Sequence, residues 1–302
     1  MASLAKETVA VVGTTGIQGE SVARTFLSLS HWNVRCLTRQ PTSDKALELA
    51  QLGGEIVLAD LKDEASLRKA FSNREASLPG RSHPRKERYQ GRSNHPDPGK
   101  VRLLSPGTYA CCIKWQILFC FPLLDQSEYR RLHRDLQVEL AKKTSYIYIG
   151  AYTTNAFLYP QFVPQTGDFI SILLTRKETC MPIINVPRST GPFVRALVED
   201  EEPRTKLLAY EDYLSIEQVV NIWKKALGKE FRLIQLTMEA MREKPGVPRE
   251  ILLGAAYLGE YSYCAGVSNV IKPARLKNRL ETQSFKDWLE GKNAMELLGA
   301  NK

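Results

Sequence analysis

Short apolar runs alternate with stretches of helical spacing over the first 71 residues. Three apolar runs are typical of buried strands: residues 8–12, 33–37 and 55–59. Apolar side chains recur at helical spacing over residues 21–29, after Ser43 and over residues 63–71. Strands that alternate with helices form parallel sheets with right-handed crossovers. The pattern therefore predicts an α/β fold with a Rossmann-like, doubly wound parallel sheet.

This pattern breaks after residue 71. Residues 72–106 are rich in Pro, Gly, Ser, Arg and His, have almost no periodicity, and are predicted to be loop or disorder. Two explanations stay open for the wider irregular segment, residues 72–127. It is either a genuine insertion or a stretch that derives from a misassigned exon or retained intron. In both cases the fourth and fifth strands of the sheet are disrupted or unrecognisable in the sequence.

Regular patterns resume at residue 128. Strands are expected at residues 145–150, 169–174 and 231–236, and helices at residues 132–143, 215–227 and 248–263. The tail, residues 272–302, has apolar side chains spaced for one buried face, which predicts a docking helix on the same domain. We expect three parts: residues 5–71 as the first half of a nucleotide-binding domain, residues 72–127 as an atypical insertion, and residues 128–302 as the remainder with a smaller α+β region for a substrate or partner.

Composition narrows the classes of function. The net charge is +9, but residues 72–102 hold eight Lys or Arg against three acids and so supply five of the nine charges. That stretch has one aromatic side chain, Tyr89, to stack on bases, which argues against a nucleic-acid partner. The six cysteines form no CxxC pair, so no metal site is indicated. The most apolar stretch, residues 109–124, is interrupted by Lys114 and Gln116 and is too short to cross a bilayer. We expect a cytoplasmic protein, or a nuclear one if its role is regulatory.

A glycine-rich loop between the first predicted strand and the first predicted helix is the first candidate site. Its residues are Gly13, Thr14, Thr15, Gly16, Ile17, Gln18 and Gly19. Gly13 allows a tight turn, Gly16 lets backbone amides approach a pyrophosphate, and Gly19 lets the helix pack closely on the sheet. The helix N-terminus offers N–H groups and a positive dipole to phosphates. The loop therefore predicts dinucleotide binding, with an ordinary glycine turn as the alternative.

The end of the second predicted strand indicates which dinucleotide. Sites specific for NAD usually place an acid there to bind the ribose 2′-hydroxyl, but no acid occurs between His31 and Ser43. Arg39 is present instead, and a guanidinium can fork onto a 2′-phosphate. The residues favour NADP(H), with a solvated surface arginine as the alternative. Asp60 and Leu61, at the end of the third predicted strand, stand where this fold passes the adenine ring.

These segments together resemble the NmrA-like family, an atypical branch of the short-chain dehydrogenase/reductase superfamily. The GxxGxxG spacing, the TRQPTS segment (residues 38–43) and the Ala59-Asp60-Leu61 segment resemble the cofactor-binding half of that family. The GAYTTN segment, residues 150–155, resembles the part that follows a strand and lines the nicotinamide end. The resemblance implies NADPH as the cofactor, and it implies cofactor contacts for Tyr152, Thr153, Thr154 and Asn155.

Two departures from the family concern its chemistry. The nearest counterpart of the family's lysine segment is residues 133–137, which places Gln137 at the lysine's position, and Ser189 stands where an Asp is usual. None of the tyrosines has a lysine four residues later, so the Tyr-x-x-x-Lys pair of the classical reductases is absent. Tyr152 is the candidate proton donor to a carbonyl, and a buried aromatic at a strand end is the alternative.

Two functions follow from these residues and from the resemblance. The first is an NADP-dependent oxidoreductase that acts on a small carbonyl or imine, as in secondary metabolism. The second is a non-catalytic regulator that senses NADP(H) and binds a protein partner. The absent Tyr-x-x-x-Lys pair favours the sensor, whereas the large second half of the chain favours a substrate pocket. The substrate and the oligomeric state are not predicted.

Overall fold

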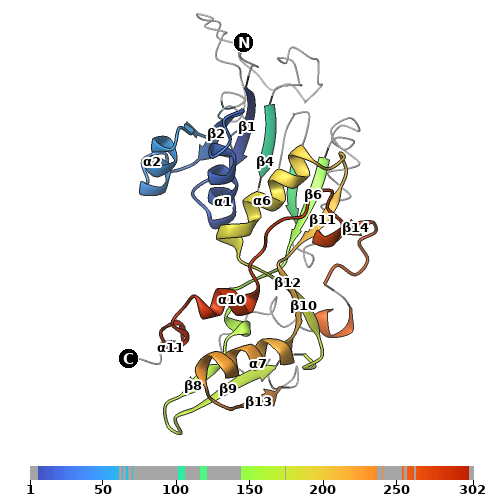
Figure 1. Cartoon of the computed structure of the whole chain (residues 1–302). Coiled ribbons are helices and arrows are strands. Elements are labelled where there is room, and N and C mark those ends of the chain that lie inside the picture. Colours follow the sequence, from blue (N-terminus) through green and yellow to red (C-terminus); the bar gives the residue numbers. More distant parts are fainter. Residues whose placement is uncertain are drawn as a thin grey trace, which may run out of the picture.

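An eight-stranded sheet is the centre of the fold (Figure 1). The computed structural model describes residues 6–60, 101–105, 116–120, 144–173, 175–236, 257–261 and 263–298, with residues 63, 66, 70, 240 and 254. The strands of the sheet are β1 (Glu7–Val12), β2 (Trp32–Thr38), β3 (Glu55–Leu58), β4 (Val101–Ser105), β5 (Gln116–Cys120), β6 (Thr144–Ile149), β11 (Lys206–Ala209) and β14 (Val270–Ile271). Their order is β14-β11-β6-β5-β4-β1-β2-β3, and every neighbouring pair is parallel.

The strand order reverses direction at β1. The chain runs outward from β1 through β2 to β3, and then returns to place β4 on the other side of β1. A ligand of a doubly wound sheet binds at such a switch point, outside the carboxyl ends of the strands. The predicted α/β, Rossmann-like parallel sheet is confirmed, and its switch point lies beside the glycine loop that follows β1.

The sequence interpretation was wrong about the fourth and fifth strands. Residues 101–105, predicted as loop, form β4, which pairs with β1 from Thr8↔Val101 to Val11↔Leu104. Residues 116–120 form β5 between β4 and β6. β4 is a short, mainly apolar run inside a long polar segment, whereas β5 lies within the apolar stretch of residues 109–124. Pairing with β1 and β6 satisfies backbone N–H and C=O groups of the two strands. The apolar run of β4 was not recognised because residues 72–106 as a whole have the composition of a loop.

Three helices cover one face of the sheet. They are α1 (Ile17–Leu27), α2 (Asp44–Gln51) and α6 (Val186–Glu199), and α1 and α6 lie side by side in Figure 1. A Cβ at Gly191 of α6 would lie 2.4 Å from the carbonyl oxygen of Ser21, so the close approach of the two helices requires glycine there. Pro192 interrupts the hydrogen bonds of α6, and the Ser21 hydroxyl accepts from the Gly191 N–H at 3.0 Å.

The second half of the chain adds a smaller α+β region below the main sheet in Figure 1. Its first sheet is β12 (Asp212–Ser215), β10 (Cys180–Ile184) and β7 (Ala151–Tyr152), and its second is β13 (Phe231–Gln235), β9 (Asp168–Leu173) and β8 (Gln161–Val163). Its described helices are η1 (Ala156–Leu158), α7 (Ile216–Leu227), α10 (Phe285–Glu290) and α11 (Ala294–Leu297), whereas η2 (Pro273–Arg275) lies against β11 of the main sheet. Trp223, Phe169 and Phe285 are at the centre of its separate hydrophobic core.

The predicted elements of this region are confirmed where the structure describes them. Ser215 begins α7 with a capping box, in which its hydroxyl accepts from the Gln218 N–H and Gln218 accepts from the Ser215 N–H. The tail buries Phe285, Trp288 and Leu289, as its spacing predicted, but it forms the short helices α10 and α11 rather than one docking helix. The predicted helix at residues 132–143 and most of those at 63–71 and 248–263 lie outside the described residues.

Candidate functional site

The glycine loop makes a tight turn from β1 into α1. Gly13 has a φ of +69°, a left-handed conformation that favours glycine, and its N–H donates to the carbonyl of Leu37 in β2 at 2.9 Å. The Gly16 N–H donates back to the Gly13 carbonyl at 2.9 Å. A Cβ at Gly19 would lie 2.2 Å from that same carbonyl oxygen. The turn requires Gly13, as the sequence predicted. Gly19 is required by its close approach to the backbone of the turn, whereas the sequence predicted packing of the helix on the sheet.

Gly16 has a different role, because the turn does not require it. Its φ is −88°, and among the described residues an added Cβ would meet only the Gly13 carbonyl oxygen within 4 Å, at 3.3 Å. Gly16 is also the N-cap of α1, where it offers no side-chain oxygen to the N–H groups of the first helical turn. The loop therefore leaves an open approach to backbone N–H groups at the positive end of an 11-residue helix.

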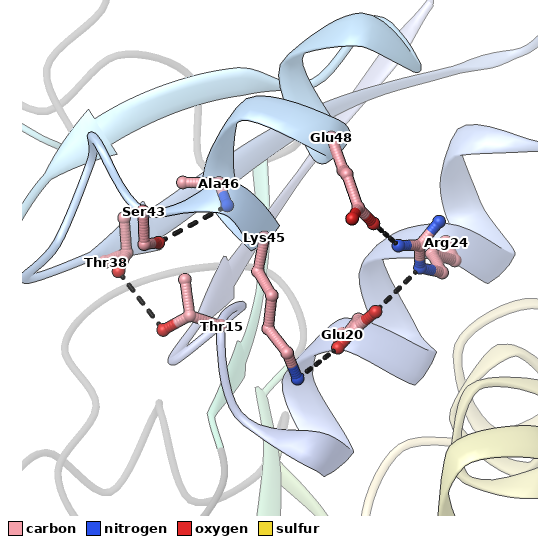
Figure 2. Close-up of polar contacts among 8 residues, drawn as sticks. All are labelled: Thr15, Glu20, Arg24, Thr38, Ser43, Lys45, Ala46 and Glu48. Carbon is pink, nitrogen blue, oxygen red and sulfur yellow. Dashed lines mark hydrogen bonds and ion pairs between the residues drawn. The ribbon is translucent and has the colours of Figure 1, made fainter.

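The loop is fixed to the end of β2 by Thr15 and Thr38 (Figure 2). Their hydroxyl groups lie 3.4 Å apart, and the Thr38 hydroxyl also accepts from the Gln40 N–H at 3.1 Å. Arg39 is exposed directly after β2. Ser43 then caps α2, since its hydroxyl accepts from the Ala46 N–H. An exposed arginine, a capping serine and the start of α2 thus follow one another directly after β2.

A chain of ion pairs adds a second cation to this region (Figure 2). Glu20 of α1 accepts from Lys45 of α2 at 2.8 Å and from Arg24 at 2.9 Å, and Arg24 also reaches Glu48. Burial acts to raise the pKa of Glu20, but the hydrogen bonds and charges of Lys45 and Arg24 together lower it below its ordinary value. The network ties α1 to α2 and holds the Lys45 ammonium close to the loop.

The third strand contributes less. The Asp60 N–H donates to the Ser66 hydroxyl at 3.0 Å, and the Asp60 carbonyl accepts from the Asp63 N–H at 3.0 Å. These contacts form a turn after β3 and do not involve the glycine loop. Leu61, the other predicted residue of this element, lies outside the described residues.

Tyr152 is brought to the glycine loop from the far end of the sequence. The Gln18 side-chain amide donates to the Tyr152 hydroxyl at 2.6 Å, across 134 positions of the chain. Tyr152 lies in β7, directly after the chain leaves β6 at Gly150. Burial raises the pKa of Tyr152, and the Gln18 hydrogen bond opposes part of this increase. The phenol therefore keeps its proton at neutral pH.

The other residues of the GAYTTN segment have more structural contacts. Thr153 is buried and its N–H donates to the Ile184 carbonyl at 3.0 Å, which fixes β7 against β10. The Asn155 N–H donates to the Tyr152 carbonyl at 2.9 Å and forms the turn before η1. Thr154, between them, is exposed. Of the four residues, the structure brings the Tyr152 side chain into contact with the loop.

Ser189 stands at the start of α6, where the family that the chain resembles usually has Asp, but a carboxylate is still present there. Glu211 supplies one from the turn between β11 and β12. It accepts from the Ser189 hydroxyl at 2.5 Å and from the Asn185 N–H at 2.6 Å. The Gln283 N–H also donates to it, at 3.2 Å. The serine and a more distant glutamate therefore hold this helix start to the C-terminal segment.

A cavity of about 400 Å³ lies elsewhere, at the amino ends of the strands, where Thr8, Trp32, Arg35 and Glu55 line it. Ligands of doubly wound sheets bind at the carboxyl ends, so we do not assign the cofactor to it. Within the described ranges no group of His, Cys, Asp and Glu side chains could hold a metal ion. In the same ranges no helix is long and apolar enough to span a bilayer.

A glycine loop that opens a helix at the switch point of a parallel sheet is the arrangement of the Rossmann-like nucleotide-binding α/β class. Comparison with known proteins shows a match for the first part of the chain. The model of the NmrA-like family matches residues 5–77, which confirms the resemblance read from the glycine loop and the end of β2.

Sequence relatives match a similar share of the chain. The NmrA-like family domain-containing oxidoreductase cpsB of Aspergillus campestris is 43% identical over 70 residues, which are 23% of this chain and 21% of that protein. The corresponding oxidoreductase malD of Malbranchea aurantiaca is 44% identical over 68 residues, 22% of this chain and 20% of that protein. The chain thus matches about one fifth of the length of these relatives.

Solved structures resemble the whole chain. NmrA, a negative transcriptional regulator, has a TM-score of 0.67 at 16% identity, with 98% of both chains covered. NmrA in complex with NADP has a TM-score of 0.63 at 16% identity, with 98% of this chain and 92% of that one covered. A leucoanthocyanidin reductase–NADPH complex from Vitis vinifera has a TM-score of 0.65 at 13% identity, with coverage of 94% and 98%. At these identities the likeness establishes the fold.

Proposed function

We propose that this protein binds NADP(H) along the glycine loop and uses it as an oxidoreductase on a small carbonyl or imine substrate of secondary metabolism. The observation that carries the proposal is the arrangement around Gly16, where an open loop and the uncapped start of α1 face a region with exposed Arg39 and with Lys45. The match of residues 5–77 to the NmrA-like family and the similarity to NmrA-like oxidoreductases support the reaction class, and the structural neighbours solved with NADP or NADPH support the cofactor.

Each group of residues then has a separate task. The N–H groups of the first turn of α1 would hold the pyrophosphate. The Arg39 guanidinium would fork onto the 2′-phosphate, with Lys45 as a second cation beside it. NADPH, when bound, supplies the hydride. The Tyr152 hydroxyl, held near the loop, would give its proton to the substrate oxygen or nitrogen.

Cofactor preference tests the binding part of this proposal. A charge-assisted hydrogen bond contributes on the order of 1.5–3 kcal/mol, roughly tenfold to a hundredfold in affinity. We expect NADPH to bind more tightly than NADH by about this ratio, and Arg39→Ala to remove most of the difference by weakening NADPH. Arg232→Ala, an exposed arginine on β13, is the matched control. The four dissociation constants are measured by calorimetry at one ionic strength.

A solvated Arg39 without a ligand role predicts another result. The substitution would then leave the ratio of NADPH to NADH affinity unchanged, and the 2′-phosphate role would be refuted. Equal affinity of the unsubstituted protein for the two cofactors would refute the NADP assignment. Added salt should reduce the preference, because the contact lies near the surface.

A second function, an NADP(H) sensor with a protein partner, is favoured by one observation. Tyr152 has no lysine four residues later, and burial raises its pKa rather than lowering it. NmrA, a negative transcriptional regulator that also has this fold, was solved in complex with NADP. Oxidation of NADPH in the presence of a panel of small ketones and imines separates the two functions, since a sensor binds NADPH without consuming it.

A further inference from the structure

The contact between Gln18 and Tyr152 joins two parts of the candidate site that are far apart in the sequence. Gln18 is the second residue of α1 and is 8% exposed, whereas Tyr152 lies in β7 and is half-buried. Their hydrogen bond is short, at 2.6 Å. A buried carboxamide at this position has a stronger requirement for a partner than an exposed one, because an unpaired polar group in the interior is costly.

The direction of this hydrogen bond decides what Tyr152 can do. The amide nitrogen of Gln18 donates, and the phenol oxygen accepts. The phenol proton is then left free, and the described part of the chain offers the hydroxyl no second partner. By contrast, the neighbouring Tyr263 hydroxyl donates to the Ile149 carbonyl at 3.0 Å, so its proton is already used.

We propose that Gln18 is the positioning residue for Tyr152: it fixes the phenol oxygen from one side and leaves the phenol proton directed at the substrate. This inference rests on the proposed function for its reaction and deepens it. Gln18 thus takes, as a neutral donor, part of the role that a lysine has in a Tyr-x-x-x-Lys pair. Gln18 also belongs to the loop that would hold the pyrophosphate. One residue therefore fixes the position of the proton donor relative to the cofactor-binding loop.

The proton transfer balances with the proposed reduction. The carbonyl carbon receives a hydride from NADPH, the π electron pair of the C=O bond moves to the oxygen, and the oxygen takes the proton of Tyr152. The tyrosinate that remains accepts the hydrogen bond of Gln18 and regains a proton from water. A neutral donor stabilises this tyrosinate less than a lysine would. The phenol therefore stays protonated before the reaction and can act as a proton donor.

The titration of Tyr152 in the protein without cofactor tests the direction of the bond. All 12 tyrosines are replaced by 3-fluorotyrosine, which titrates in milder alkali, and the ¹⁹F resonance that disappears in Tyr152→Phe is assigned to Tyr152. Gln18→Leu removes the donor and leaves an apolar side chain of similar size. We expect the titration midpoint of Tyr152 to move to higher pH, since the phenolate loses a donor. Gln51→Leu, the same change at the exposed end of α2, should leave the midpoint in place.

Three results would overturn the proposal. A midpoint that moves to lower pH means that Tyr152 donates to Gln18, so its proton is already used. An unchanged midpoint in a folded Gln18→Leu protein means that the two side chains only pack together. If Gln18→Leu does not fold, Gln18→Met is the second variant, and failure of both assigns Gln18 to the packing of α1.

A second measurement keeps this proposal distinguishable from the proposed function. NADPH consumption with 9,10-phenanthrenequinone as the probe is followed for the same variants, and Gln18→Leu should lower kcat roughly threefold to tenfold with the KM for NADPH nearly unchanged. If the unsubstituted protein binds NADPH but does not reduce the probe, the carbonyl substrate class is wrong. The Tyr152 titration still decides the role of Gln18, because it needs neither cofactor nor substrate.

Discussion

Gly16 and Gly19, three residues apart in the loop, should respond to the same substitution in different ways. Gly19→Ala places a Cβ 2.2 Å from the Gly13 carbonyl oxygen and 2.7 Å from its carbon, both in the backbone. Overpacking against atoms that cannot rotate away costs about 3 kcal/mol, at the upper end of the usual range. Alanine returns about 1 kcal/mol through its helix propensity. We therefore expect a net loss of about 2 kcal/mol, which lowers Tm by about 4–8 °C for a domain of this size.

Gly16→Ala should keep the fold and lose the ligand. Its Cβ would meet the Gly13 carbonyl oxygen at 3.3 Å, and the φ of −88° is open to any residue. Replacement of glycine by alanine at an N-cap costs at most about 1 kcal/mol. The methyl group, however, stands where the pyrophosphate would approach the amides of α1, so NADPH affinity should fall at least about tenfold.

Thermal denaturation followed by circular dichroism measures the first effect, and calorimetric titration with NADPH measures the second. The order of the two variants must invert between the assays: Gly19→Ala is the less stable protein, and Gly16→Ala is the weaker binder. An unchanged dissociation constant in Gly16→Ala would remove the phosphate role of the loop. A Gly19→Ala protein as stable as its parent would show that α1 does not approach the turn as closely as described.

Two further predictions concern stability. Gly191→Ala in α6 should lower Tm, because its Cβ would lie 2.0 Å from the Thr25 hydroxyl oxygen and close to the Ser21 backbone; an unchanged melting curve would contradict the packing of α1 on α6. Hydrogen bonds and charges also hold the pKa values of Glu20 and Glu199 below the ordinary glutamate pKa, although burial acts to raise them. The two carboxylates therefore contribute their full stabilisation above the ordinary pKa, and this stabilisation is lost as pH falls through the lowered pKa. The urea midpoint should drop between roughly pH 5 and pH 3, and less steeply in Glu199→Gln; equal acid sensitivity of the two proteins would refute this.

The first half of the fold could be predicted because its signals are local. β1, β2 and β3 are apolar runs, α2 has a Ser cap, and the loop between β1 and α1 has its glycines at the required spacing. Strand β4 could not be predicted in the same way. Its five residues have little preference of their own inside a long polar segment, and they become a strand because β1 offers an unpaired edge.

The candidate residues could be proposed one by one from the sequence, but their arrangement could not. Arg39 and the loop are recognisable from residue type and position. Lys45 was missed, although it follows the Ser43 cap by two residues, because a lysine on a helix is ordinarily a solvated side chain. Its closeness to the loop depends on Glu20, 25 positions earlier. The bond from Gln18 to Tyr152 has no sequence signal, since nothing local relates residues 134 positions apart.

This difference in how the residues are held bears on the choice between reductase and sensor. The candidate cofactor residues, from Gly13 to Lys45, form one contiguous βαβα stretch with its own hydrogen bonds and ion pairs. The candidate proton donor depends on a single bond from Gln18, on a strand supplied by the second half of the chain. Under the proposed function, loss of that bond would leave a protein that still binds NADP(H) and reduces its substrate more slowly. A reductase and a sensor can therefore share this fold and loop and differ at Gln18 and Tyr152, so the state of the Tyr152 proton, rather than cofactor affinity, is the property that separates the two functions.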